Sequence, residues 1–193
     1  MAKSLAVAGV TGAVGQEFLQ VLADRNFPFS SIKMLASSRS IGKTVQFKGT
    51  TYTVEELTKD SFAGIDIALF SAGASRSLEF APAAVSAGAV VVDNSSAFRM
   101  DPEVPLVVPE VNPDAVKSHK GIIANPNCTT MAAMPVLKPL HDEAGLVRMI
   151  ASTYQAVSGS GLAGVEELIG QAKAAVEGSR ALVHDGRAVD FPA

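Results

Sequence analysis

The chain has 193 residues, of which 48% are hydrophobic and 18% are charged, and its formal net charge is −3. This length allows one domain with a sizeable core. The charge balance provides no basic face of the kind that binds nucleic acid, and no run of about 18 consecutive apolar residues is present to span a membrane. The composition therefore indicates a globular protein with neither a nucleic-acid nor a membrane partner.

Apolar runs alternate with amphipathic segments along the first two thirds of the chain. We expect strands where the apolar residues are continuous, at 4–9, 32–37, 66–72, 89–94, 105–110 and 121–125. Helices are expected at 14–25 and 75–87, and the alternating segment 45–54 around Lys48-Gly49 predicts a small hairpin. Continuous apolar strands are typical of parallel sheets covered on both faces. The pattern predicts a Rossmann-like, doubly wound α/β sheet.

The pattern changes after the last of these strands. We expect a helix through about Glu143, a strand at 147–157, a helix near 163–177 and a loop over the final residues, LVHDGRAVDFPA. The sequence divides into a Rossmann-like domain at 1–130 and the incomplete start of an α+β catalytic or dimerisation domain at 131–193. About 60 residues are few for an independent core, so we expect the chain to be the front part of something longer.

The first strand leads directly into GVTGAVG, which places Gly9, Gly12 and Gly15 at three-residue intervals where a helix begins. Glycines permit a tight turn and close backbone approach, and free N–H groups at a helix N-terminus suit a pyrophosphate. The spacing differs from G-x-G-x-x-G, and a tight turn without a ligand stays an alternative. The strand–turn–helix context predicts a dinucleotide site.

The end of the second strand, ASSRSIGK, indicates which dinucleotide is bound. An NAD site places an acidic residue there to hold the ribose 2′-hydroxyl. Here Ser37, Ser38, Arg39 and Ser40 offer hydroxyls and a guanidinium, which suit a 2′-phosphate. We therefore expect NADP as the cofactor; the alternative is that Arg39 is a solvated surface residue.

Two further strands end in small or polar residues at the same expected edge of the sheet, where ligands of open α/β sheets gather. FSAGAS (70–75) contains Ser71 in a turn that lets a dinucleotide pass close to the backbone. DNSSAF (93–98) contains Asn94, which we expect near the nicotinamide ribose. Arg99 follows and is a candidate for holding an anionic substrate group, or else a solvated loop residue.

The chain has one cysteine, Cys128 in NPNCTT, so it forms no internal disulfide, which fits a reducing cytoplasm. A lone cysteine is often a small buried apolar residue. Cys128, however, lies between polar residues at a strand-to-helix junction, where Thr129 or Thr130 is expected to cap the helix. N–H groups at a helix N-terminus favour a thiolate and bind a developing oxyanion. Beside a nicotinamide, such a thiol indicates acyl-thioester chemistry.

Six segments in order resemble the bacterial aspartate-semialdehyde dehydrogenase family: GVTGAVG, IDIALFSAG, VVDNSSAFR, PLVVPEVN, GIIANPNCTT and STYQAVSGSGLAG. The resemblance covers essentially the whole chain. It implies the NADPH-dependent reductive dephosphorylation of L-4-aspartyl phosphate to L-aspartate 4-semialdehyde and phosphate, a step towards lysine, threonine, methionine and diaminopimelate. It also implies a homodimer for the complete protein and a site without metal.

The resemblance assigns roles to individual residues. Cys128 matches the nucleophile that forms the acyl thioester, and Gln155 matches the glutamine that orients the substrate beside it. Arg99 matches the phosphate-binding arginine, and Asn127 matches a residue lining the substrate and phosphate site. The residues that match the family's cofactor contacts are Thr11, Gly12, Ala13, Val14, Arg39, Ser40, Ser158 and Gly159. The turns described above add four further candidates for cofactor binding, Gly9, Ser37, Ser71 and Asn94.

The family's general base is a histidine well downstream of the glutamine. The three histidines of this chain, His119, His141 and His184, lie elsewhere, and we assign none of them. Turnover needs a group that moves a proton. We therefore expect the chain to be truncated and to show little or no turnover alone.

Two alternatives to this function stay open. Glyceraldehyde-3-phosphate dehydrogenase, another cysteine acyl-phosphate reductase, also has Cys-Thr-Thr with a proline seven residues after the cysteine, as Cys128 and Pro135 are here. It usually has an acidic residue after its second strand and lacks YQAVSGSG, and N-acetyl-glutamyl-phosphate reductase differs around its cysteine. The other alternative is a non-catalytic NADP-binding module in which Cys128 is structural.

Overall fold

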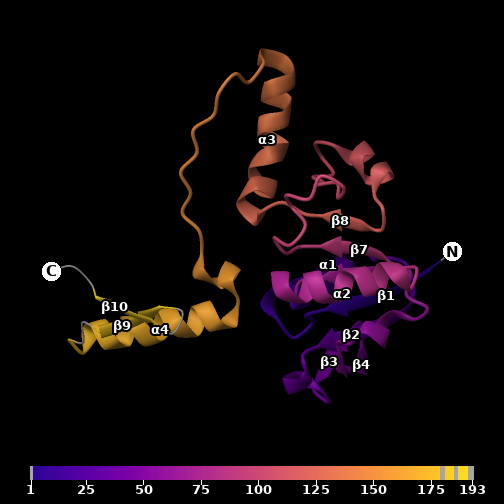
Figure 1. The fold of residues 1–193 in the computed structure, drawn as a ribbon, viewed down its shortest axis with the longest axis horizontal. Helices are drawn as coiled ribbons and strands as arrows, with labels where there is room; N and C mark the ends of the chain where they lie inside the picture. The colour runs from indigo at the N-terminus through magenta and orange to yellow at the C-terminus, as the bar shows by residue number, and fades with distance from the viewer. Residues whose placement is uncertain (1, 179–180, 185–186, 191–193) are drawn as a thin grey trace. The chain divides into compact units, whose positions relative to one another are not determined.

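The computed structural model describes residues 2–178, 181–184 and 187–190. The chain forms two compact units, Met1–Ala151 and Ser152–Ala193 (Figure 1). The first unit contains a parallel sheet with its helices, and the second contains a helix and a hairpin.

Six parallel strands form the sheet of the first unit. Their order across the sheet is β5 (Glu55–Glu56), β2 (Phe29–Ala36), β1 (Lys3–Ala8), β6 (Ile67–Phe70), β7 (Val90–Asp93) and β8 (Ile122–Ala124). From β1 the chain moves to β2 on one side and later returns to β6 on the other. The direction of winding therefore reverses between β1 and β6, which is where open α/β sheets bind ligands.

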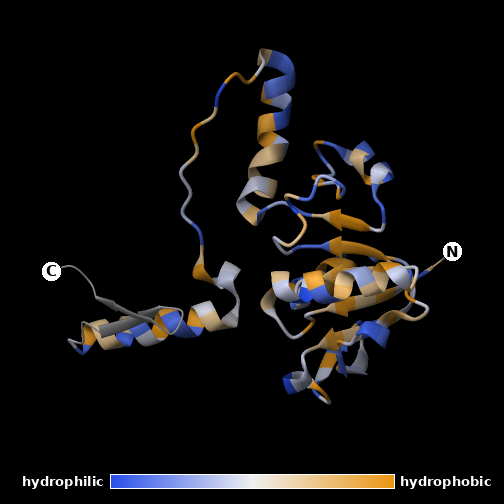
Figure 2. Ribbon diagram, viewed as in Figure 1, coloured by the Kyte–Doolittle hydropathy of each residue, from blue (hydrophilic) through white to orange (hydrophobic). Residues whose placement is uncertain are grey.

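Helices cover both faces of this sheet, because alternate residues of each strand point to opposite faces. Leu5 and Val7 of β1 belong to the core on the side of α1 (Ala13–Asp24), whereas Ala6 and Ala8 belong to the core on the side of α2 (Ala74–Ser86). Figure 2 shows the hydrophobic residues concentrated along the strands. The predicted Rossmann-like, doubly wound fold is confirmed.

The predicted hairpin is also confirmed, as β3 (Thr44–Phe47) paired antiparallel with β4 (Thr50–Thr53). Its two turn residues, Lys48 and Gly49, have φ of 48° and 78°, as a two-residue hairpin turn requires. Short 3-10 helices complete the unit: η1 (Ser38–Ser40), η2 (Lys59–Phe62) and η3 (Pro113–Ser118).

Two expected strands do not form. In 105–110 only an isolated bridge between Leu106 and Ala124 is present, because Pro105 and Pro109 have no N–H to donate to a ladder. Residues 145–156, which cover most of the expected strand at 147–157, contain no regular element. A strand needs a neighbour to pair with, and the described part of the chain supplies none for this segment.

The expected helices after Cys128 are confirmed as α3 (Cys128–Ala144) and, in the second unit, α4 (Leu162–Val176). Between them lies η4 (Val157–Ser160). The loop predicted for the chain end is wrong within the described residues: β9 (Ala181–His184) and β10 (Arg187–Asp190) form an antiparallel hairpin, with β9 beside α4 (Figure 1). Antiparallel pairing through a short turn needs only local contacts, which the alternation in LVHDGRAVD permits.

Candidate active site

The predicted site residues of the first unit follow strands β1, β2, β6, β7 and β8. These strands all run in the same direction, so their carboxyl ends meet at one edge of the sheet. The turns at this edge, which we call the carboxyl edge, are Gly9–Gly15, Ser37–Ser40, Ser71–Gly73, Asn94–Arg99 and Asn125–Cys128. The fold thus brings five separate sequence motifs to a common edge.

The glycine turn is fixed to the neighbouring strand by its backbone. The N–H groups of Gly9 and Val10 both donate to the carbonyl of Leu35, at 2.9 and 3.1 Å. Gln16 Nε2 donates to the carbonyl of Val10 at 2.6 Å. Gly12 is the N-cap of α1, no side chain caps this end, and the first turn contains no acidic residue. The N-terminus of α1 therefore keeps the free N–H groups that bind an anion.

The turns after β1 and β6 touch each other where the winding of the sheet reverses. Gly9 has φ +91°, and a Cβ placed on it would lie 2.4 Å from the carbonyl oxygen of Ser71. A Cβ on Gly15 would lie 2.2 Å from the carbonyl oxygen of Gly9. Ser71 N–H donates to the carbonyl of Ala8 at 2.9 Å. Because these glycines have no Cβ, the backbones of the turns approach each other closely, as in the tight turn of a dinucleotide-binding fold.

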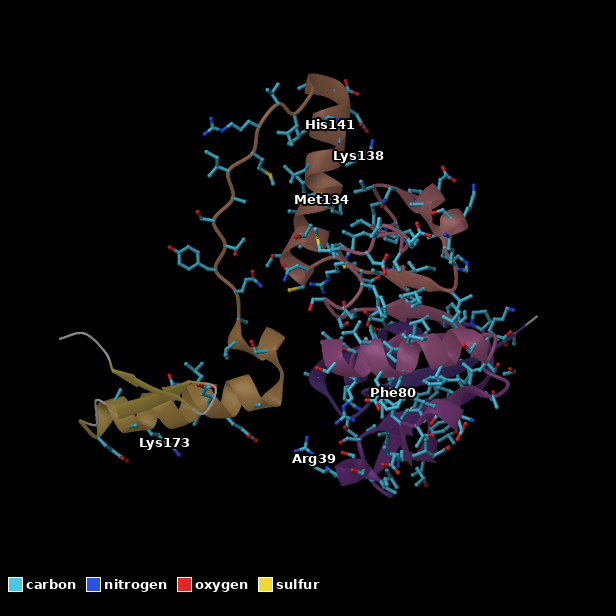
Figure 3. All side chains as sticks on the ribbon, viewed as in Figure 1. Arg39, Phe80, Met134, Lys138, His141 and Lys173 are labelled. Atoms are coloured by element: carbon cyan, nitrogen blue, oxygen red, sulfur yellow. The ribbon has the colours of Figure 1, made fainter. Side chains whose placement is uncertain are left out.

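The turn after β2 carries the residues predicted to select the cofactor. Arg39 is exposed, in η1 (Figure 3), and Ser40 is buried. Ser40 Oγ lies 3.5 Å from Thr11 Oγ1 of the glycine turn. The two turns predicted to contact the cofactor are therefore neighbours, and 37–41 contains no acidic residue.

Arg99 links the turn after β7 to the turn after β8. Its Nε donates to the carbonyl of Asn125 at 2.8 Å, and its Nη2 donates to the carbonyl of Asn94 at 3.0 Å. A guanidinium has five N–H groups. Within the described residues Nη1 has no hydrogen-bond partner, so half-buried Arg99 retains donors for an anion.

Cys128 is the first residue of α3, and it is exposed. The expectation that Thr129 or Thr130 caps this helix is wrong: Asn127 is the N-cap, and its Oδ1 accepts from Thr129 N–H at 3.0 Å and from Thr129 Oγ1. An N-cap side chain accepts from the N–H of the second or third residue of the helix, and Asn127 is placed to reach Thr129, the second residue of α3. The thiol therefore stands at a capped helix N-terminus whose first turn contains no acidic residue.

Three predicted residues belong to the second unit. Gln155 is exposed, and its Oε1 accepts from Thr153 Oγ1 at 3.2 Å. Ser158 and Gly159 lie in η4. Their predicted roles stay predictions.

The histidines have local structural partners or lie in the terminal hairpin. His119 Nδ1 accepts from Gly121 N–H at 3.0 Å, and His141 Nδ1 accepts from Leu146 N–H at 3.1 Å after the end of α3. His184 belongs to β9. Among the described residues no group of three or more His, Cys, Asp or Glu is suited to hold a metal ion. The same part of the chain contains no helix that is both long and apolar enough to span a membrane.

One carboxyl group has a pKa far from its ordinary value. Hydrogen bonds from the backbone and the hydroxyl of Ser4, with Lys3 nearby, lower the pKa of Asp66 to about 2. The Ser4 N–H and Oγ both lie 2.8 Å from Asp66 Oδ2. Asp66 precedes β6, at the end of the sheet opposite the carboxyl edge. Its carboxylate therefore links the start of β1, through Ser4, to the start of β6 and does not belong to the site.

Sequence reasoning missed two residues of the carboxyl edge, Gln16 and Asp93. Gln16 reads as an ordinary polar helix residue, although its position one residue after the glycine pattern is a signal. Asp93 ends the apolar run AVVVD, and a carboxyl group at the end of a buried strand is a signal that we did not use.

Comparison with known proteins gives two matches to family models. Residues 4–119 match the semialdehyde dehydrogenase NAD-binding domain, and residues 137–191 match the semialdehyde dehydrogenase dimerisation domain. The chain is 58% identical over 194 residues to the aspartate-semialdehyde dehydrogenase of Mycolicibacterium smegmatis, covering 98% of this chain and 56% of that protein. It is 57% identical over 181 residues to that of Aquifex aeolicus, covering 92% and 53%. The chain thus spans about half the length of the curated relatives it matches.

Solved structures of aspartate semialdehyde dehydrogenases also match the chain. Aspartate semialdehyde dehydrogenase II of Vibrio cholerae, crystallised in complex with ASA, matches with a TM-score of 0.89 and 43% identity over 99% of this chain and 57% of that one. Aspartate semialdehyde dehydrogenase from Candida albicans, with NADP, matches with a TM-score of 0.64 and 29% identity over 76% of this chain and 48% of that one. The Vibrio cholerae match covers nearly all of the chain and therefore includes the glycine turn and the helix that carries Cys128.

Proposed function

Because the chain belongs to the semialdehyde dehydrogenase family, we propose that it carries the cofactor-binding and nucleophile portion of an NADP-dependent aspartate-semialdehyde dehydrogenase. The reaction is the reductive dephosphorylation of L-4-aspartyl phosphate to L-aspartate 4-semialdehyde. The observation that carries the proposal is that two helix N-termini lie at the same edge of the sheet. One carries the exposed Cys128, and the other, that of α1, follows the glycine turn and has no side-chain cap. The relatives from Mycolicibacterium smegmatis and Aquifex aeolicus are named aspartate-semialdehyde dehydrogenase, which supports the proposal.

The residues of the glycine turn fit a dinucleotide. A Cβ on Gly9 or Gly15 would collide with neighbouring backbone, so only glycine allows this tight turn, and the N-terminus of α1 has no side-chain cap. A pyrophosphate on the backbone from Thr11 to Val14 would accept from the N–H groups of Thr11, Ala13 and Val14, because the N–H of Gly12 donates to the carbonyl of Gly9 at 3.0 Å. NADPH, when bound there, supplies the hydride that reduces the acyl group.

We assign the covalent step to Cys128. Its sulfur attacks the acyl carbon of aspartyl phosphate, a carbon–sulfur bond forms, and the carbon–oxygen bond to phosphate breaks. N–H groups at the start of α3 stabilise the oxyanion that develops on the acyl oxygen. Arg99 holds the phosphate with the donors it has left, Asn127 lines the site while capping the helix, and Gln155 orients the substrate. None of the three histidines is assigned as the base, so turnover by these residues alone is expected to be slow.

NADP is the proposed cofactor in preference to NAD. Arg39 and the hydroxyls of Ser37 and Ser40 follow β2, where an NAD site has a carboxylate. Ser71, Asn94, Ser158 and Gly159 are the proposed further contacts. An exposed guanidinium gives a 2′-phosphate a charged partner without a burial cost.

The cofactor assignment is tested by titrating NADPH and NADH into the protein and reading their fluorescence. Arg39→Asp is expected to weaken NADPH binding and to strengthen NADH binding, because the carboxylate repels a 2′-phosphate and accepts from a 2′-hydroxyl. Arg25→Asp, a charge reversal of the same size beyond the end of α1, is the matched control and is expected to leave both affinities within about twofold. Unchanged NADPH and NADH affinities in Arg39→Asp would contradict the assignment of NADP as the cofactor.

The substrate assignment is tested against related acyl-phosphate reductases. Acyl transfer to Cys128 is expected from aspartyl phosphate and not from the acyl phosphate that corresponds to glyceraldehyde 3-phosphate. Acyl transfer from the second compound and not from aspartyl phosphate would show that the proposed substrate is wrong. Tight NADP binding with no acyl transfer at all would support a non-catalytic binding module.

We further propose that the complete protein is a cytoplasmic homodimer. A dimerisation-domain match over residues 137–191 supports the dimer, and a single unpaired cysteine suits a reducing compartment. The boundary that we propose between the two domains lies at residue 130.

A further inference from the structure

Asp93 is a fully buried acidic residue at the carboxyl edge to which the proposed function gives no role. Its exposed fraction is 0%. Its carboxyl group accepts three hydrogen bonds, from Ser77 Oγ at 2.7 Å, from Ser95 N–H at 3.1 Å and from Ser95 Oγ at 2.7 Å. No Lys, Arg or His side chain within the described residues pairs with it. A buried carboxyl group is costly unless its hydrogen bonds are made, so this arrangement depends on all three donors.

The hydrogen bonds of Asp93 continue into the loop that carries Arg99. Ser95 Oγ donates to Asp93 and also accepts from Ala97 N–H at 3.1 Å, which closes a turn over Ser95–Ala97. Phe98, 8% exposed, then anchors the chain in the core on the side of α2. Arg99 follows directly. The direction in which Arg99 leaves the loop is therefore set by the turn that Asp93 holds.

The network closes on the loop before the cysteine. Asn125 N–H donates to the Asp93 carbonyl at 2.9 Å, and the Asn125 carbonyl accepts from Arg99 Nε at 2.8 Å. Arg99 Nη2 donates to the carbonyl of Asn94 at 3.0 Å. Asp93, the Ser95 turn, Arg99 and Asn125 thus form a ring of contacts, and Cys128 lies three residues after Asn125.

We propose that Asp93 is a positioning residue: through Ser95 it holds the guanidinium of Arg99 oriented to bind a phosphate group beside Cys128. The inference rests on the proposed function, which gives Arg99 the phosphate. Asp93 does not touch the substrate and acts only through the loop. The other residue that donates to its carboxyl group, Ser77 of α2, also makes a buried hydroxyl hydrogen bond but lies outside the loop.

This difference between the two serines supplies the test. Ser95→Ala removes the donor to Asp93 Oδ2 and the acceptor for Ala97, so the turn keeps only the hydrogen bond from the residue 95 N–H to Asp93 and is weakened. Ser77→Ala removes one buried hydrogen bond to the same carboxyl group and leaves the turn intact. Both variants are expected to be less stable than the unaltered protein, but only Ser95→Ala is expected to bind phosphate more weakly.

The measurement is the rate at which iodoacetamide alkylates Cys128 in the 193-residue chain over a series of inorganic phosphate concentrations. Phosphate is expected to protect the thiol. The phosphate concentration that halves the rate is expected to rise about tenfold in Ser95→Ala and to stay within about twofold in Ser77→Ala. Asp93→Asn is the second variant. Its amide has one acceptor oxygen where the carboxylate has two, so it cannot accept from Ser95 Oγ while keeping the bonds from Ser77 Oγ and Ser95 N–H. It is therefore expected to resemble Ser95→Ala, and it keeps the shape of the side chain should Ser95→Ala fail to fold.

Unchanged protection in Ser95→Ala and Asp93→Asn would overturn the inference. Equal weakening of phosphate protection in Ser77→Ala and Ser95→Ala would also overturn it, because Asp93 would then act only through the general stability of the fold. Absence of phosphate protection in the unaltered protein would overturn it as well. In that last case, NADPH binding and acyl transfer from aspartyl phosphate, measured separately, decide whether the proposed function falls too.

Discussion

Gly9→Ala tests the contact between the turns after β1 and β6 from which the cofactor site is built. Two costs add at this position. The φ of +91° is unfavourable for an L side chain by about 1–2 kcal/mol. The new Cβ would also lie 2.4, 2.7 and 3.0 Å from three backbone atoms of Ser71 and Ala72, which cannot rotate away. Overpacking of this kind costs about 1–3 kcal/mol, so the expected total is about 2–5 kcal/mol.

Gly42→Ala is the matched control because it separates the two costs. Gly42 has φ +78°, but a Cβ there would meet nothing within 4 Å. Only the conformational cost applies, and the expected loss is about 1–2 kcal/mol. Equilibrium unfolding in urea, followed by circular dichroism, gives the free energy of unfolding of each variant from its midpoint and slope.

The contact predicts that Gly9→Ala is less stable than Gly42→Ala by about 1–3 kcal/mol, and that its NADPH affinity falls while that of Gly42→Ala does not. Equal losses of stability in the two variants would show that the turns after β1 and β6 do not touch as described. The backbone argument for the cofactor site would then be refuted.

Three further predictions concern single side chains. Hydrogen bonds lower the Asp66 pKa from 3.8 to about 2, so its carboxylate stabilises the fold above pH 3.8 and this contribution is lost as the pH falls to about 2. The difference in free energy of unfolding between the unaltered protein and Asp66→Asn, measured by urea unfolding, should therefore shrink over that range. Asn127→Ala removes the N-cap of α3 and is expected to cost about 1 kcal/mol and to slow alkylation of Cys128, whereas Asn127→Asp should retain the cap. Gln16→Leu frees the carbonyl of Val10 and is expected to weaken NADPH binding, measured by its fluorescence, with little effect on Cys128 alkylation.

The sequence predicted best those features that depend on neighbouring residues. The strand, glycine turn and helix from Lys3 to Asp24 are defined by local hydrophobicity and by glycine spacing, and they form as predicted. Residues 105–110 and 147–157 are equally apolar, but a strand also needs a partner and available N–H groups. Prolines limit the first to an isolated bridge, and the second has no partner in the described chain.

The candidate site was predictable as a set of motifs but not as a network. A strand-to-helix junction identifies Cys128, yet three polar residues nearby are all good caps, and only the backbone geometry selects Asn127. The contacts of Asp93 and Arg99 join residues 16 and 26 positions apart. Such contacts follow from the register of the sheet, which hydrophobic patterns leave undetermined.

The central claim is that Cys128 accepts an acyl group from aspartyl phosphate. The most direct test is the intact mass of the protein after brief incubation with L-4-aspartyl phosphate, compared with that of Cys128→Ala. The unaltered protein is expected to gain one aspartyl group, which hydroxylamine removes, and Cys128→Ala is expected to gain none. No gain in the unaltered protein, or the same gain in both proteins, would contradict it.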